Sequence, residues 1–375
     1  MGENSYSIKI SWTVNANLPS EEVALVIPGG DLGFSDWTDP PMFDYLTWSG
    51  SRERLFKIEY IGNLELEFPT ILHISPAANR YFAFALSDSI YVAEIYWIDI
   101  QTRNLFGFDP PCQSITTVGE DSLAIGPEWL AYVCDEDQTT WHAFSLADPS
   151  ITISIHLPFE EEFSKGFEPF WLDSETLVLD RLRSSDTRCI VDISDVSEPI
   201  VSCETFDLTL GRFSTDRNRM EVRVSYDTTD AKPEEIGVLN AACFSTPIRC
   251  TPDFFFSPFG PGQGSLFLQD TTWLPDGTWI LYLQFEEMTV NTVFDRDTRL
   301  WIFDLQQESF YQIADLEPPL LFNHYSDHSD AIWSADGNRV LLQNALSIYA
   351  FDLTDGTLLM LNDDGGIAIG IVDLP

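Results

Sequence analysis

The chain has 375 residues, of which 44% are hydrophobic, and its 60 acidic and 19 basic residues give it a formal net charge of −41. The hydrophobic content is sufficient for a large buried core, which excludes an intrinsically disordered chain in spite of the charge. A surface this acidic repels phosphate backbones and anionic lipid headgroups, because binding to either depends on Lys and Arg. We therefore expect no nucleic-acid partner.

Neither a membrane span nor a leader sequence is visible. No segment approaches the roughly 18 uninterrupted apolar residues that a membrane-spanning helix requires. The N-terminal residues Met1-Gly-Glu-Asn-Ser5 have neither the basic start nor the apolar region of a secretory signal. If the protein is exported, its signal must already have been removed.

The apolar residues occur in short runs rich in Ile, Val, Phe, Tyr and Trp, separated by Pro, Gly, Asp, Asn and Ser. Such runs predict β-strands rather than helices. The clearest of them, in chain order, are Tyr81–Leu86, Tyr91–Ile98, Leu177–Leu179, Trp279–Phe285, Leu300–Leu305 and Val340–Gln343. Because sustained helical periodicity is almost absent, the sequence predicts an all-β protein.

The region Phe43–Phe68 contains further strand-like runs but is too short to form a four-stranded sheet by itself. Two completions are open. Either the N-terminal runs Tyr6–Val14 and Val23–Ile27 join it, or the C-terminal segment Gly366–Asp373 does. The second arrangement would close a ring of sheets by joining the two chain ends.

A repeated sequence unit indicates which all-β fold the chain adopts. It consists of an apolar strand, a turn rich in Pro, Asp and Gly, a second strand, and a third strand that ends in an apolar residue before Asp. It recurs at intervals of 42 to 60 residues between positions 75 and 334. The clearest copies begin at Trp273-Leu-Pro-Asp-Gly277 and Trp333-Ser-Ala-Asp-Gly337. Intervals of this length are typical of the blades of a propeller.

One four-stranded sheet cannot bury both of its faces, so repeated sheets must stack side by side, and closing the ring leaves only short edges. We expect the Trp or Phe before each turn to fill the space between neighbouring sheets. Asp-Gly and Asn in the turns tolerate the positive φ that tight connections require. The sequence therefore predicts one β-propeller domain over residues 1–375, with seven four-stranded blades, or six or eight, and its ring closed by N- and C-terminal strands.

These repeats resemble the TolB-type, WD-repeat-like β-propeller family, whose hallmark is a Trp-Ser-Pro-Asp-Gly turn followed by an aliphatic strand. Residues 273–277 and 333–337 each match the hallmark in four of five places, and Ser75-Pro76 and Ser214-Thr-Asp216 keep fragments of it. The resemblance covers roughly residues 43–361. It implies the fold but not a function, since the family's Ser, Asp and Gly build turns.

Six cysteines formally allow fifteen disulfide connectivities. Cys189 and Cys203 lie in two β-rich runs around a turn near Val196, which would place them opposite each other in a hairpin, close enough for a disulfide. Cys243 and Cys250 form a tighter version of this arrangement, and Cys112 and Cys134 are paired by elimination. The alternative is six reduced, buried thiols. Three disulfides favour an extracellular or cell-surface protein.

An unusual aromatic segment, Pro252-Asp-Phe-Phe-Phe-Ser-Pro-Phe-Gly-Pro-Gly-Gln-Gly264, is expected to be a loop between two blades. If Phe254, Phe255, Phe256 and Phe259 are exposed, they would form a patch of the kind that marks a binding site. If they fold back, they would cap the core between blades.

The densest group of possible metal ligands comprises His324, Asp327, His328 and Asp330, which zinc or copper could use. The alternative is a set of polar turn residues before the last blade. Acidic turns at Asp135–Asp137, Asp295–Asp297 and Asp363–Gly365 could hold structural calcium, which prefers oxygen ligands in flexible loops. No other cofactor is expected.

The sequence contains no Gly-x-Ser-x-Gly elbow, no His-Glu-x-x-His and no Walker loop. It therefore predicts a monomeric, non-catalytic, extracellular propeller that binds a protein, a peptide or a glycan. The alternative is a secreted polysaccharide hydrolase or lyase, with two carboxylates at the central channel of the ring. Spacing alone cannot place two acids at a catalytic separation.

Overall fold

The computed structural model describes the following residues: 7–13, 23–27, 42–61, 70–71, 75–77, 80–88, 91–111, 123–134, 137–158, 167–181, 186–206, 209–214, 219–224, 235–240, 254–256, 266–277, 279–286, 298–307, 309–317, 320–322, 332–334, 336–344, 347–363 and 367–372. All regular secondary structure in these residues is β-strand, which confirms the predicted all-β class. The strands form seven antiparallel sheets, named here sheets 1 to 7 in chain order. The chain divides into two compact units.

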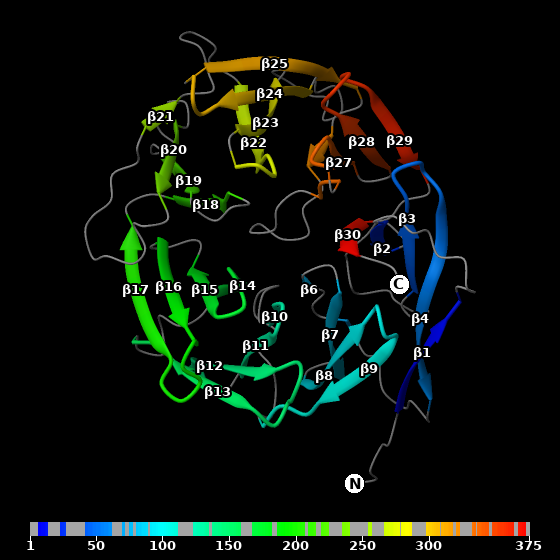
Figure 1. The fold of residues 1–375 in the computed structure, drawn as a ribbon, viewed down its shortest axis with the longest axis vertical. Coiled ribbons are helices and arrows are strands. Elements are labelled where there is room, and N and C mark those ends of the chain that lie inside the picture. The colour runs from blue at the N-terminus through cyan, green and yellow to red at the C-terminus, as the bar shows by residue number, and fades with distance from the viewer. Residues whose placement is uncertain are drawn as a thin grey trace. The chain divides into compact units, whose positions relative to one another are not determined.

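Unit 1 contains sheets 1 to 4 (Figure 1). Sheet 1 has the order β1 (Ser7–Trp12), β4 (Arg52–Ile61), β3 (Met42–Leu46), β2 (Val23–Ile27) and β30 (Ile367–Val372). Sheet 2 contains β5 (Thr70–Ile71), β6 (Ser75–Ala77), β7 (Tyr81–Asp88), β8 (Tyr91–Asp99) and β9 (Asn104–Phe108). Sheet 3 contains β10 (Leu123–Ile125), β11 (Trp129–Cys134), β12 (Asp137–Ser145) and β13 (Thr152–His156). Sheet 4 contains β14 (Phe167–Trp171), β15 (Thr176–Arg181), β16 (Asp186–Asp192) and β17 (Ile200–Phe206).

Unit 2 contains sheets 5 to 7, each with its strands in sequence order. Sheet 5 contains β18 (Thr209–Phe213), β19 (Arg219–Val224), β20 (Glu235–Asn240) and β21 (Phe254–Phe256). Sheet 6 contains β22 (Leu266–Trp273), β23 (Trp279–Glu286), β24 (Thr298–Asp304) and β25 (Ser309–Leu316). Sheet 7 contains β26 (Leu321–Phe322), β27 (Arg339–Gln343), β28 (Ile348–Asp352) and β29 (Leu358–Asn362).

Sheet 1 combines strands from both ends of the chain. The C-terminal strand β30 lies beside β2, and β1 lies at the opposite edge, beside β4. The sequence left the N-terminal runs and the C-terminal segment as alternative completions of this sheet, and the structure includes both. The two N-terminal strands β1 and β2 complete a four-stranded sheet with β3 and β4, and β30 adds a fifth strand. The single closed ring over residues 1–375 stays a prediction.

The hydrophobic core lies between neighbouring sheets within each unit. In unit 1, one cluster joins sheets 2 and 3 and contains the buried Trp97 and Phe144. A second cluster joins sheets 3 and 4 and contains Trp141 and Leu177. In unit 2, the residues that pack together come from sheets 6 and 7. Sheet 3 therefore buries apolar side chains against the sheets on both sides of it, as the stacking argument requires.

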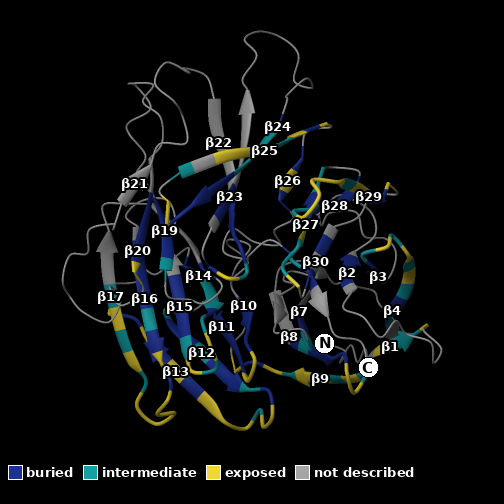
Figure 2. Ribbon diagram, turned by 45° about the horizontal axis from the view of Figure 1, so that its top comes forward, coloured by how far each residue is buried: buried dark blue, intermediate teal, exposed yellow. Residues whose placement is uncertain are grey.

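The first strands of successive sheets lie next to one another inside each unit. Strand β10 contacts β6 and β14 in unit 1, and β22 contacts β18 and β26 in unit 2. Figure 2 shows the complementary pattern in sheets 3 and 4, where β11 and β15 are largely buried while β13 and β17 carry exposed residues. The outermost strand of each of these sheets is thus a surface that can meet other molecules.

The part of the chain that the structure describes contains no helix that could span a membrane.

Candidate functional site

The structure places three of the predicted binding residues, Phe254, Phe255 and Phe256, in strand β21. This differs from the loop that Pro and Gly on both sides of them suggested. The reason is local, because Phe favours strands and three residues suffice to pair with β20. Phe259 lies outside the described residues, and so do all four predicted metal ligands, His324, Asp327, His328 and Asp330.

Strand β21 is the outermost strand of sheet 5 and pairs with β20 only. Its register places Phe254 opposite Val238, Phe255 opposite Gly237, and Phe256 opposite Ile236. These three aromatic residues therefore lie at the edge of sheet 5.

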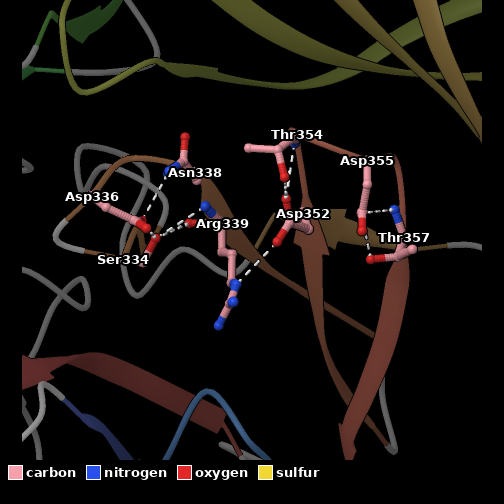
Figure 3. A network of polar contacts seen from close by, with 8 residues as sticks. All are labelled: Ser334, Asp336, Asn338, Arg339, Asp352, Thr354, Asp355 and Thr357. Atoms are coloured by element: carbon pink, nitrogen blue, oxygen red, sulfur yellow. Dashed lines mark hydrogen bonds and ion pairs between the residues drawn. The ribbon is translucent and has the colours of Figure 1, made fainter.

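The polar residues of the repeated turn form a network that is internal to sheet 7 (Figure 3). Ser334 Oγ donates to Asp336 Oδ1 at 2.6 Å and accepts from the backbone N–H of Arg339 at 3.0 Å. Ser214 accepts from the backbone N–H of Arg219 at the same distance in sheet 5. These contacts hold the turn between the first two strands, so they give the Ser and Asp of the motif a structural role.

The positive φ predicted for the Asp-Gly turns is confirmed at two equivalent positions. Gly277 has a φ of 68° and Gly337 a φ of 69°. Each donates its N–H at 2.8 Å to the carbonyl three residues earlier, that of Leu274 or Ser334. Glycine adopts this conformation without the steric cost that a Cβ atom brings. The two clearest copies of the repeat therefore fold into the same turn.

The aspartates that end the third strand of a sheet also build turns. Asp99 accepts the N–H groups of Gln101 and Thr102, and Asp352 accepts the N–H of Thr354. The hydrogen bond from the Arg80 side chain is the main cause that lowers the pKa of Asp99. Hydrogen bonds from the side chain and backbone of Thr354 lower the pKa of Asp352. The pKa shift of Asp99 thus reflects its pairing with Arg80, and that of Asp352 its hydrogen bonds within the turn.

Exposed apolar side chains occur on the outermost strands of sheets 6 and 7. Tyr311 is 48% and Ile313 36% exposed on β25, and Leu359 and Met360 are both 51% exposed on β29. We call these four residues the outer-strand apolar set. The hydroxyl of Tyr311 donates to Gln307 Oε1 at 3.0 Å, which holds the exposed ring in place. Sequence reasoning missed this set because alternation along a strand does not show which strand is outermost.

Both of these strands carry an irregularity at the same place. In sheet 6 the register shifts between Leu300 and Trp301, and in sheet 7 it shifts between Ile348 and Tyr349. Counted back from the Asp that ends β24 or β28, the two positions are equivalent. Bulges bend an edge strand and discourage another strand from pairing with it. We therefore expect a partner to contact the side chains of the outer-strand apolar set rather than to pair with the backbone of these edge strands.

Disulfides were the other predicted feature. Cys189 in β16 and Cys203 in β17 form the predicted disulfide, with their Cα atoms 4.0 Å apart. Cys134 is also disulfide-bonded, and no cysteine among the described residues is free. Cys112, Cys243 and Cys250 lie outside the described residues. The hairpin argument for Cys189 and Cys203 is thus confirmed, and the other two pairings stay predictions.

Within the part of the chain that the structure describes, no three His, Cys, Asp or Glu side chains come together as a metal site. Of the acidic turns suggested for calcium, Asp363 is described and exposed, whereas Asp135, Asp295 and Asp364 lie outside the described residues. Structural calcium therefore stays a prediction.

No protein-family model matches the sequence, and no curated protein matches it significantly. Among solved structures, prolyl oligopeptidase B from Galerina marginata matches with a TM-score of 0.53 and 8% identity over 93% of this chain and 52% of that chain. The β-propeller domain of the Trilobed protease from Pyrococcus furiosus matches with a TM-score of 0.46 and 13% identity over 92% and 99%. An oligogalacturonate lyase in complex with manganese matches with a TM-score of 0.46 and 12% identity over 79% and 81%. Such low identities show the fold alone: the chain is an all-β β-propeller.

Proposed function

We propose that this protein is an extracellular, non-catalytic β-propeller of the TolB-like, WD-repeat-like type that binds a protein or peptide partner. The observation that carries the proposal is the outer-strand apolar set, four large side chains exposed on the outermost strands of two successive sheets. Tyr and Met are frequent at recognition surfaces, Tyr because it offers a rigid contact area and Met because it adapts its shape. Aliphatic side chains fit a polypeptide better than a glycan.

Several aspartates of the described residues are engaged in turns, so we do not assign them the role of a general acid. The carboxylates whose pKa is lowered by hydrogen bonds with neighbouring turn residues include Asp148, Asp192, Asp195, Asp336 and Asp352. A general acid would instead need a pKa raised towards neutrality. The Cys189–Cys203 disulfide and the acidic composition support an extracellular location, where disulfides persist and charge keeps a protein dispersed.

Strand β21 is the second candidate part of the recognition surface. It is an edge strand, it consists entirely of Phe, and the next aromatic residue, Phe259, follows three residues later. Aromatic side chains at such a position could also stack on the sugar rings of a glycan. The outer-strand apolar set would therefore favour a polypeptide and β21 a glycan. Substitutions in one set at a time show which of the two contributes to binding.

The test is selection of peptides from a phage-displayed random library on the immobilised, oxidised protein, followed by affinity measurements with the selected peptides as purified ligands. Binding should fall at least tenfold in a Tyr311→Ser, Leu359→Ser or Met360→Ser variant if the apolar set is the surface. A loss of affinity in a Phe255→Ser variant would instead indicate that β21 takes part in binding. Ile200→Ser is the matched control, because Ile200 is 65% exposed on the outermost strand of sheet 4 in the other unit.

Thermal unfolding of each variant separates lost binding from lost folding. Equal affinity of all variants for every selected peptide would contradict the proposed surface. Release of reducing ends or unsaturated products from a panel of polysaccharides would overturn the non-catalytic role and favour the alternative hydrolase or lyase.

A further inference from the structure

Two histidines lie together on one face of sheet 3, although they are 14 residues apart in the sequence. In the antiparallel pairing of β12 with β13, Thr140 lies opposite His156 and His142 lies opposite Ser154. Residues two apart share a face of a strand, so these four residues form a quadrangle on one face. The imidazoles occupy one diagonal of it and the hydroxyls the other.

Each imidazole is oriented by the hydroxyl on the opposite strand. Thr140 Oγ1 lies 2.9 Å from Nδ1 of His156, and Ser154 Oγ lies 3.4 Å from Nδ1 of His142. The ring of His142 also stacks on that of Tyr132 from β11, with 5.3 Å between centroids. His156 is exposed and His142 half-buried, so the pair is accessible from solvent. His156 is thus oriented by a contact with β12, and His142 by contacts with β11 and β13.

This arrangement has the features of a metal-binding pair. In the tautomer whose Nδ1–H donates a hydrogen bond to the facing hydroxyl oxygen, Nε2 carries the lone pair, which is the arrangement that outer partners impose on metal-bound histidines. Diagonal neighbours on adjacent strands are within reach of long and aromatic side chains, and a metal lies only about 2.0–2.1 Å from each imidazole nitrogen. Imidazole suits zinc, copper and nickel, whereas calcium and magnesium prefer oxygen ligands.

We propose that His142 and His156 form a two-histidine site for a divalent transition metal, zinc, copper or nickel, on the outer part of sheet 3. Two protein ligands leave further coordination positions for water or for a donor group of a bound molecule. The site shares no residue with the predicted cluster at His324–Asp330 or with the outer-strand apolar set. Its failure would therefore leave the proposed binding function untouched.

The test is calorimetric titration of the purified, oxidised protein with NiCl2, ZnCl2 and CuCl2 in excess MgCl2, which occupies the many carboxylates. We expect His142→Asn and His156→Asn each to weaken nickel and zinc binding about tenfold or more, and the double variant to abolish this site. His73→Asn is the matched control. His324→Asn/His328→Asn tests the sequence-predicted cluster, and loss of all transition-metal binding in that variant alone would overturn the proposal.

A second measurement guards against variants that fail to fold. In the wild-type protein, the imidazole resonances of His142 and His156, assigned by NMR, should broaden first when substoichiometric Cu2+ is added. The positioning role of the hydroxyls is tested with Thr140→Val and Ser154→Ala, which should weaken binding about 10-fold while leaving thermal stability nearly unchanged for the exposed Ser154. Broadening confined to other histidines would refute the two-histidine site.

Discussion

Thr271 in β22 donates a hydrogen bond from Oγ1 to Oε2 of Glu221 in β19 at 2.6 Å, and both side chains are completely buried. The contact joins sheets 5 and 6 inside unit 2. A second bond joins the same sheets, since Arg219 Nη1 donates to the carbonyl of Gly277 at 3.1 Å. A buried carboxylate is costly unless it is hydrogen-bonded. Polar contacts thus help to fix how these two sheets pack.

Replacing Thr271 by Val keeps the shape of the side chain and removes the donor. We expect the free energy of unfolding to fall by about 1.5–3 kcal/mol, the range for a hydrogen bond to a charged group. Urea denaturation followed by tryptophan fluorescence measures the change. Thr152→Val on the exposed side of β13 is the control and should change the stability by less than about 0.5 kcal/mol. Equal effects of the two substitutions would show that the bond to Glu221 is not stabilising.

The disulfide between β16 and β17 supports a second prediction. The bond closes a loop with a sequence separation of 14 residues, and Cys189 is completely buried against sheet 3. Removing a disulfide that closes a loop of this size lowers the free energy of unfolding of the protein by about 3 kcal/mol. The double variant Cys189→Ser/Cys203→Ser should therefore unfold at lower urea concentration than the oxidised wild type. If its midpoint equals that of the wild type, the bond does not constrain the unfolded chain.

The sequence predicted the fold where local chemistry determines it. Asp-Gly turns such as the one ending at Gly277 need only a residue that tolerates positive φ, and the Cys189 and Cys203 hairpin follows from two strands and a turn. What the sequence could not show depends on pairing between strands. The bulge near Trp301 and the shared face of His142 and His156 follow from register, and the outermost position of Tyr311 follows from strand order; tertiary packing sets both.

Asp99 and Arg80 allow a prediction about acid stability. Arg80 Nη2 lies 2.6 Å from Asp99 Oδ2, and this bond lowers the pKa of a carboxyl that is almost completely buried. A carboxyl whose pKa is lower in the folded state stabilises the protein above its unfolded pKa, near 3.9, and this contribution is lost as the pH falls through the folded pKa. We expect Asp99→Asn to be less stable than the wild type at pH 6.

The difference between the two proteins should shrink steadily as the pH falls below 4 towards the lowered pKa of Asp99. Thermal unfolding between pH 2 and pH 6 measures it. Comparing the two proteins at each pH removes the general effect of titrating the other carboxylates. A difference that stays constant over this range would mean that Asp99 acts through packing and not through its charge.

Gly126 and Trp171 show how one sheet is fitted to the next in unit 1. The Trp171 indole donates from Nε1 to the carbonyl of Ala124 at 3.2 Å, and its ring covers Gly126. A Cβ atom at position 126 would lie 2.5 Å from Cγ of Trp171, closer than atoms can approach. The aromatic residue before the turn therefore fills the space between sheets 3 and 4, as the repeat predicted, and only glycine leaves room for it.

Gly126→Ala should lower the free energy of unfolding by about 1–3 kcal/mol, because the ring must move out of a well-packed core. Trp171→Phe supplies the partner for a double-mutant cycle, since the smaller ring gives the new methyl group more room. We expect Gly126→Ala to cost less in the Trp171→Phe background, with a coupling energy of about 0.5 kcal/mol or more. Urea denaturation of the four proteins measures it. Strictly additive effects would mean that alanine is excluded from position 126 for a reason other than contact with the Trp171 ring.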